Sequence, residues 1–187
     1  MQRRFLILTP QLTEFKLLDG NPMSDMRFIE AVREGLREEM ESDSHVFLIG
    51  QDIGVNGGVF RVTEGLQVQF GTHRVIDSPL AESGLVGVAI GAALNEMRPV
   101  VEIQFADFIF PAFNQLVSEA ARMYYRTNGD YPVPMVVRAP YGGGVRGGLY
   151  HSQSVEAFFA HVPGLKVVVP SNPYDAKGLF VQSIRDN

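Results

Sequence analysis

Short apolar runs alternate with segments of helical periodicity along most of this chain. Each run is rich in Val, Ile, Leu or Phe, which favours a buried strand. Strands that alternate with helices indicate βαβ units, whose right-handed crossovers build a parallel sheet. We therefore expect a three-layer α/β/α fold with a mainly parallel sheet. The strands are expected at 46–49, 75–76, 100–105, 134–137 and 165–169.

The helical segments differ in character. In the first, Ser24 can cap a helix whose apolar residues share one face. The second contains many small apolar residues and three glycines, which predicts a buried helix that other backbone can approach closely. In the last, Pro173 stands near the start, where a helix tolerates proline. The four helices are expected at 24–40, 82–96, 111–126 and 173–183.

Composition narrows the class of protein. With 187 residues and 45% hydrophobic side chains, the chain suits one globular domain. A net charge of −5 argues against a nucleic-acid binder and against a polybasic membrane anchor. No apolar run approaches the roughly 20 residues that span a bilayer. The absence of cysteine excludes disulfides, cysteine–zinc sites, iron–sulfur clusters and thiol nucleophiles.

Residues 1–22 differ from the rest of the chain. They begin with two arginines and a four-residue apolar run, which is shorter than the roughly 7–15 residues of a secretory signal. We expect an extension that is flexible or that reflects a misassigned start, with Met23 as the natural first residue. The domain itself is expected over 23–187.

A glycine-rich segment, 141–148, follows the fourth expected strand and matches the pattern GxGxxG. A dinucleotide site would need a helix to begin there, with the pyrophosphate at the helix N-terminus. Residues 149–153 do not read as such a helix. An active-site loop is therefore the favoured interpretation.

Three side chains near expected strand ends could carry chemistry. Glu82 opens the second helix, where it could interact with the helix dipole or act as an acid/base group in an apolar pocket. His151 could be structural or catalytic, but no GxSxG motif supports a serine hydrolase. Phe108 is expected beside a pocket, whereas Phe105, Phe110 and Phe113 are expected in the core.

Several ordered motifs together resemble one family from about Met23 to Asn187. The chain resembles the β subunit of the thiamine-diphosphate-dependent E1 component of 2-oxo acid dehydrogenase complexes, in its N-terminal pyrimidine-binding domain. Residues 106–113 and 149–161 look most like the branched-chain (2-oxoisovalerate) members, while 171–177 and 184–187 occur also in bacterial pyruvate-type members. The motifs are Gly50-Gln-Asp-Ile-Gly54, Gly57-Gly-Val-Phe60, Arg74-Val-Ile-Asp-Ser-Pro79, Glu82-Ser-Gly84, Arg98-Pro-Val-Val-Glu-Ile-Gln-Phe105, His151-Ser-Gln-Ser154, Pro163-Gly-Leu-Lys-Val-Val168 and Asp175-Ala-Lys-Gly178.

The resemblance implies a transketolase-like pyrimidine-binding domain. It further implies oxidative decarboxylation of a branched-chain 2-oxo acid and acyl transfer to a lipoyl group, with thiamine diphosphate as cofactor. Glu82 matches the glutamate that hydrogen-bonds N1′ of the aminopyrimidine. Leu80, Gln104 and Phe108 match other positions around the pyrimidine half, and His151 matches the histidine that assists substrate binding and acyl transfer.

The resemblance also implies partners and ions. The family holds Mg²⁺ and the diphosphate on an α subunit through a Gly-Asp-Gly…Asn signature, which this sequence lacks. An α₂β₂ heterotetramer is expected, with an E1 α subunit, a second β subunit and the lipoyl-acyltransferase E2 core as partners. A structural potassium ion is expected in some relatives at the positions of Met135, Ser183, Ile184 and Asp186. The implied location is the cytoplasm in bacteria or archaea and the mitochondrial matrix in eukaryotes.

Other functions stay open at this point. Family β subunits carry a C-terminal domain that this chain is expected to lack, so a truncated, catalytically silent fragment that binds an α subunit is one alternative. A pyruvate or acetoin dehydrogenase E1 β subunit is another. A transketolase-like enzyme is a third, although the segment 151–154 argues against it.

Overall fold

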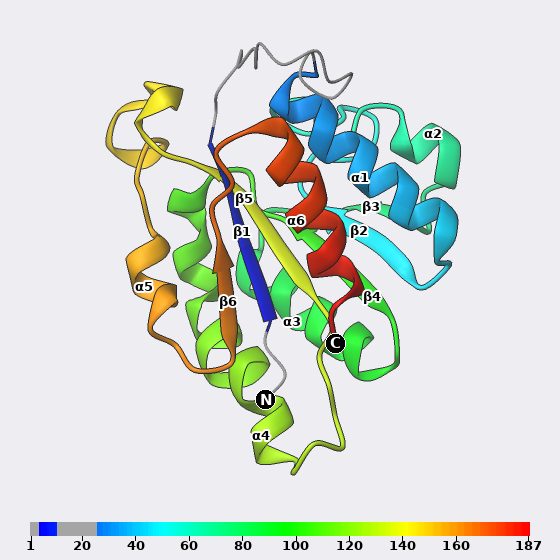
Figure 1. Cartoon of the computed structure of the whole chain (residues 1–187), viewed down its shortest axis with the longest axis vertical. Coiled ribbons are helices and arrows are strands. Elements are labelled where there is room, and N and C mark those ends of the chain that lie inside the picture. Colours follow the sequence, from blue (N-terminus) through cyan, green and yellow to red (C-terminus); the bar gives the residue numbers. More distant parts are fainter. Residues whose placement is uncertain (1–3, 11–25) are drawn as a thin grey trace.

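Six parallel strands form one sheet in the described part of the chain. The computed structural model describes residues 4–10 and 26–187, and the strand order is β3-β2-β4-β5-β1-β6, with every adjacent pair parallel (Figure 1). The predicted mainly parallel α/β fold is therefore confirmed. The strands are β1 (Arg4–Pro10), β2 (Val46–Gly50), β3 (Val75–Asp77), β4 (Arg98–Glu102), β5 (Val136–Tyr141) and β6 (Leu165–Val168).

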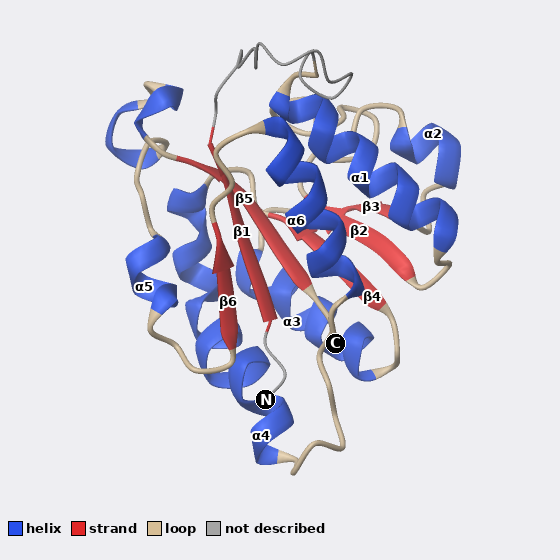
Figure 2. Cartoon of the chain, viewed as in Figure 1, coloured by secondary structure: helices blue, strands red, loops and turns tan. Residues whose placement is uncertain are grey.

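Helices cover both faces of the sheet, so the fold has three layers (Figure 2). One face carries α1 (Phe28–Ser42), α2 (Leu66–Phe70) and α6 (Pro173–Arg185). The other carries α3 (Glu82–Leu94), the 3-10 helix η2 (Ala106–Ala112), the π-helical turn η3 (Gln115–Ala120), α4 (Ala121–Arg126) and α5 (Glu156–Ala160). Two short 3-10 turns, η4 (Gly143–Val145) and η5 (Gly148–Tyr150), follow β5.

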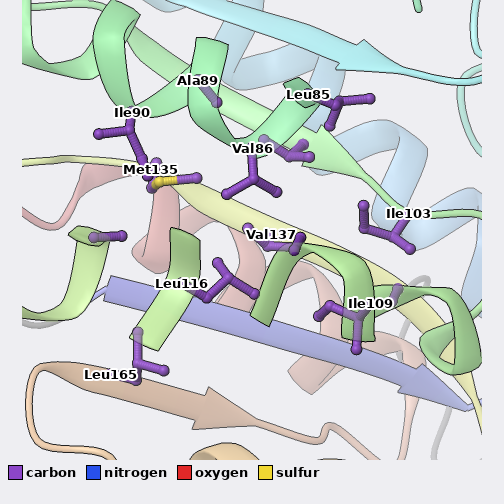
Figure 3. Close-up of a cluster of buried hydrophobic side chains, with 14 of the residues drawn as sticks. Leu85, Val86, Ala89, Ile90, Ile103, Ile109, Leu116, Met135, Val137 and Leu165 are labelled. Atoms are coloured by element: carbon purple, nitrogen blue, oxygen red, sulfur yellow. The ribbon is translucent and has the colours of Figure 1, made fainter. Parts of the chain in front are cut away.

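The core consists of two apolar clusters, one on each face of the sheet. Alternate residues of a strand point to opposite faces. In β4, Val100 therefore packs with α1 and α6, whereas Val101 packs with α3. Figure 3 shows the cluster on the α3 side of the sheet, where Val86 of α3 lies near Val137 of β5. A parallel sheet buried on both faces explains why its strands are short, continuous apolar runs.

Helix α1 matches the predicted apolar stripe but begins later than expected. Val32, Leu36 and Met40 are buried against the sheet. The expected cap, Ser24, lies outside the described residues, and the helix begins at Phe28 after Arg27. The Arg27 backbone N–H donates to the Glu30 carboxylate at 3.0 Å, so the N3 carboxylate satisfies the free amide of the N-cap residue.

Two other predictions differ from the structure in detail. The loop-rich region 50–72 contains the five-residue helix α2, which is too short for a periodic apolar pattern to reveal. The helix expected at 111–126 is divided into the end of η2, the π turn η3 and α4. Pro111 lies inside η2 and has no backbone N–H to donate, which favours irregular helical geometry there.

Strand β1 lies in the interior of the sheet. Its backbone pairs with β5 on one side and with β6 on the other, and Ile7 is in register with Arg138 and Val168. For these residues the structure differs from the extension expected over 1–22, because an apolar run too short for a signal peptide is long enough for a strand. Residues 1–3 and 11–22 of that expected extension lie outside the described residues.

Candidate active site

The site lies where loops leave the carboxyl ends of adjacent strands. In open parallel sheets this edge forms the usual ligand-binding crevice. The loop after β2 begins at Gln51, the turn between β3 and α3 holds Leu80, and the loop after β4 contains Gln104. The long loop after β5 carries His151.

Glu82 is the first residue of α3, and its carboxylate is half-buried. Gln51 Nε2 donates a hydrogen bond to Glu82 Oε1 at 3.2 Å, and the Gln51 residue is only 6% exposed. The Glu82 carboxylate therefore lies at a helix N-terminus and accepts a hydrogen bond from a buried amide. The position of Glu82 is therefore compatible both with a helix N-terminal acid and with an acid/base group in a pocket.

Gln104 connects the loop after β4 to the loop after β2. Its Nε2 donates to Asp52 Oδ2 at 3.1 Å. Asp52 has a positive φ of 56° and directly follows Gln51. The predicted residues Gln104 and Glu82 therefore bind neighbouring side chains of a single loop.

His151 lies among phenylalanine rings. Its ring centroid is 4.6 Å from that of Phe105 and 5.3 Å from that of Phe108, both in edge-to-face geometry. Phe60 contacts Phe105 in the same way at 5.5 Å. The structure thus places two of the predicted site residues, His151 and Phe108, in contact. It adds Phe60, and it moves Phe105 from the expected core to a half-buried place beside the histidine.

Leu80 is 80% exposed, two residues before Glu82. An apolar side chain this exposed at the rim of a site offers a surface that a ligand or partner can cover.

The glycine-rich loop holds His151 against η2. The Gly147 backbone N–H donates to Ser152 Oγ at 2.8 Å, and the Gln153 backbone N–H donates to Asp107 Oδ2 at 3.3 Å. The loop forms the two short turns η4 and η5, so it lacks the helix that a dinucleotide site needs. This geometry supports the active-site loop interpretation.

A buried ion pair underlies the site. Arg138 of β5 donates from Nη1 to Glu102 Oε1 of β4, and the two residues are 3% and 8% exposed. Burial raises the pKa of the Glu102 carboxyl, and the charge and hydrogen bond of Arg138 oppose that rise. Arg138 Nε is buried without a hydrogen-bond partner among the described residues. Glu102 and Arg138 are register partners on the adjacent strands β4 and β5. The loop after β4 carries Gln104, and the loop after β5 carries His151.

Comparison with known families identifies the fold family. The chain matches the family described as "Transketolase, pyrimidine binding domain" over residues 24–187. It belongs to that family. The match begins after β1, which precedes the shared region. A solved split-gene transketolase, described as an inactive β4 tetramer, has the same fold: the TM-score is 0.64 at 19% identity, over 83% of this chain and 47% of that one.

Curated relatives are more similar in sequence. The chain is 62% identical over 164 residues to the 2-oxoisovalerate dehydrogenase subunit beta of Bacillus subtilis and 54% identical over 169 residues to that of Pseudomonas aeruginosa. It is 50% identical over 165 residues to the pyruvate dehydrogenase E1 component subunit beta of Bacillus subtilis. These matches cover 88%, 90% and 88% of the chain but 50%, 48% and 51% of the relatives. The resemblance is therefore confirmed, and the chain spans about half the length of these relatives.

Three of the four expected potassium positions, Ser183, Ile184 and Asp186, lie where α6 ends, and Met135 directly precedes β5. Arg98 Nη1 donates to the Ile184 carbonyl at 2.7 Å and to the Asp186 carbonyl at 3.2 Å. Met135 and Ser183 are both buried. A cation at the carbonyls of Ile184 and Asp186 would face the Arg98 guanidinium. The potassium site stays a prediction, and no step below depends on it.

Two further observations concern the described residues alone. No group of three or more His, Cys, Asp or Glu side chains there could hold a metal ion. In the same part of the chain, no helix combines the length and apolarity needed to cross a membrane.

Proposed function

We propose that this chain is the pyrimidine-binding domain of an E1 β subunit that acts on a branched-chain 2-oxo acid. The observation that carries the proposal is the half-buried Glu82 carboxylate, fixed by Gln51 at the strand edge that also holds Gln104, Phe108 and His151. The donor set fits an aminopyrimidine, which needs a carboxyl at a ring nitrogen and flat apolar surfaces against the ring. The names of the two 2-oxoisovalerate dehydrogenase relatives favour the branched-chain substrate.

Each residue then has a distinct role. Thiamine diphosphate, when bound, supplies the carbanion and the electron sink for decarboxylation. Glu82 would share a proton between its carboxyl and N1′ of the pyrimidine. Phe108 would pack against that ring, and Gln104 and Leu80 would complete its surroundings. Apolar rings exclude water from the reacting centre.

His151 binds the substrate and assists acyl transfer to the lipoyl group. The rings of Phe105 and Phe108 contact the imidazole edge-to-face and so restrict the orientation of its plane. This arrangement suits a group that must donate or accept a proton during turnover.

The site requires partners. Mg²⁺ and the diphosphate are assigned to an E1 α subunit, in an α₂β₂ assembly with a second β subunit, and the E2 core receives the acyl group. The proposed location of the assembly is the cytoplasm if the chain is bacterial or archaeal, and the mitochondrial matrix if it is eukaryotic.

The test is reconstitution of the full chain with a 2-oxoisovalerate-type E1 α subunit and thiamine diphosphate. We expect decarboxylation of 3-methyl-2-oxobutanoate to exceed that of pyruvate, and Glu82→Gln to lower turnover by at least about 100-fold. Glu96→Gln, an exposed carboxyl just beyond the other end of α3, is the matched control and should leave turnover unchanged. His151→Ala should mainly impair substrate use and acyl transfer.

Contrary outcomes are specific. Full turnover in Glu82→Gln would remove the proposed role of that carboxyl. A preference for pyruvate would favour the pyruvate-type function, for which the 50% identical relative is the support. Binding to the α subunit without turnover in the wild type would favour a silent α-binding fragment, an alternative motivated by the half-length match.

A further inference from the structure

Gln51 is a buried polar side chain with a specific partner. It follows Gly50 at the end of β2 and is 6% exposed, and its amide donates to Glu82 Oε1 at 3.2 Å across a separation of 31 residues. A buried amide is costly unless it is hydrogen-bonded. Its orientation and that of the Glu82 carboxylate therefore depend on each other.

We propose that Gln51 is a positioning residue that orients the Glu82 carboxylate toward the pyrimidine and keeps a neutral donor beside it. The proposal rests on the proposed role of Glu82. Gln51 binds one carboxylate oxygen, Oε1, while no described residue donates to Oε2. Holding one oxygen leaves the other directed to a ligand, which is the arrangement that a proton-sharing carboxyl needs.

The loop that carries Gln51 is fixed on both sides. The Gly54 backbone N–H donates to Asp77 Oδ1 at 2.8 Å, and Thr63 Oγ1 donates to the Ile53 carbonyl at 2.7 Å. The Gly58 backbone N–H donates to the Asp52 carbonyl at 2.8 Å. These bonds tie the residues directly after Gln51 to β3 and to the following loop. The amide can therefore hold Glu82 from a rigid support, as preorganised catalytic groups require.

The other charged groups on elements packed against α3 have partners of their own. Glu102 of β4 points to the opposite face of the sheet and binds Arg138. Asp107 of η2 accepts from Gln153. The remaining groups are Arg98 of β4, which binds the end of α6, and Glu119 of η3, which lies 3.7 Å from Arg126. Gln51 is thus the group in the described residues that donates to Glu82.

Because the Gln51 amide is neutral, replacing it by a carboxyl tests whether its lack of charge matters. A carboxyl at position 51 would place two like charges at hydrogen-bond distance, and two such groups resist being ionised together. In the assembled E1 enzyme, Gln51→Glu should move the acid limb of the pH–rate profile upward by about one pH unit. Gln51→Leu keeps the volume but removes the donor, and should lower kcat about 10-fold with KM for the 2-oxo acid changed less than about twofold.

The matched controls are Gln69→Glu and Gln69→Leu. Gln69 also donates its amide to a glutamate, Glu41, at 2.7 Å, but at an exposed place away from the site. Neither control should alter kcat or the pH profile. A merely structural role of Gln51 would lower the amount of folded enzyme without moving the pH profile.

A second readout does not depend on activity. In the full chain labelled with ¹⁵N, the side-chain amide signal of Gln51 should shift with pH as Glu82 ionises, and Glu82→Gln should abolish that shift. A Gln51 amide signal that does not titrate, or Gln51 variants with wild-type kcat and pH profile, would overturn the proposal. An active Glu82→Gln enzyme would instead overturn the proposed function, so the two failures are distinguishable.

Discussion

Removing either partner of the buried Glu102–Arg138 pair should destabilise the chain, with a different dependence on pH in each case. Both residues are buried, and Arg138 already lacks a partner for its Nε among the described residues. In Glu102→Gln, the guanidinium stays charged at every accessible pH, because arginine does not lose its proton in proteins. In Arg138→Met, the Glu102 carboxyl can take up a proton and become neutral.

The magnitudes follow from this difference. Breaking a buried pair costs about 3–5 kcal/mol when an uncompensated charge remains, so Glu102→Gln should lose that amount wherever the wild-type carboxyl is ionised. In Arg138→Met, burial alone acts on Glu102 and raises its pKa above the ordinary 4.5. An acid with a raised pKa in the folded state contributes full stability below the unfolded pKa and loses it as pH rises. The loss should therefore be larger at pH 7 than at pH 5, because the unfolded chain releases the Glu102 proton at a lower pH than the folded variant does.

The assay is urea unfolding of the full chain at pH 5 and pH 7, with each variant compared with the wild type at the same pH. The double variant Glu102→Gln/Arg138→Met removes both charges of the pair and should recover most of the loss. A loss in Arg138→Met that is equal at pH 5 and pH 7 would refute the reasoning, as would strict additivity in the double variant.

Two further predictions concern glycines and the histidine cluster. A Cβ at Gly50 would lie 2.7 Å from Glu102 Cβ, so Gly50→Ala should lower the free energy of unfolding in urea by about 1–3 kcal/mol. A Cβ at Gly87 would meet no neighbour within 4 Å, so Gly87→Ala should leave that free energy unchanged or raise it by up to about 1 kcal/mol. Equal effects would contradict the close contact at the end of β2. Phe105→Leu should change the ring-current shift of the His151 ring protons in NMR spectra and leave the contribution of Phe108. An unchanged signal would mean that the rings of Phe105 and His151 do not touch in solution.

Local sequence predicted most of the sheet because parallel strands buried on both faces are unbroken apolar runs. Strand β2 was expected at 46–49 and is found at Val46–Gly50. Helix ends were harder, because α1 begins beside the Arg27–Glu30 bond and not at a serine cap. The π turn η3 and the short α2 have no period that a sequence pattern could reveal.

The residues of the candidate site were predicted in a different way from the strands. Glu82 and His151 were predicted from their strand-end positions and from the family resemblance, and Phe108 from its place after a strand. Gln51 and Phe105 were not, since their importance depends on contacts between loops that are far apart in the chain. The one local signal for Gln51 was that a polar residue directly follows a buried strand. Its partner, Glu82, could be named only from the fold, because the two residues are 31 positions apart.

The place of β1 in the sheet makes the start of the domain testable. An interior strand uses its backbone N–H groups in both ladders, and β1 pairs with β5 and with β6. Ile7→Pro removes one N–H and is poorly tolerated inside a sheet, so it should lower the unfolding free energy by more than about 1 kcal/mol. Ile7→Val keeps the N–H and the strand preference, and should cost less. Equal stability of both variants with the wild type in urea unfolding would mean that residues 4–10 lie outside the folded domain, as the sequence alone had indicated.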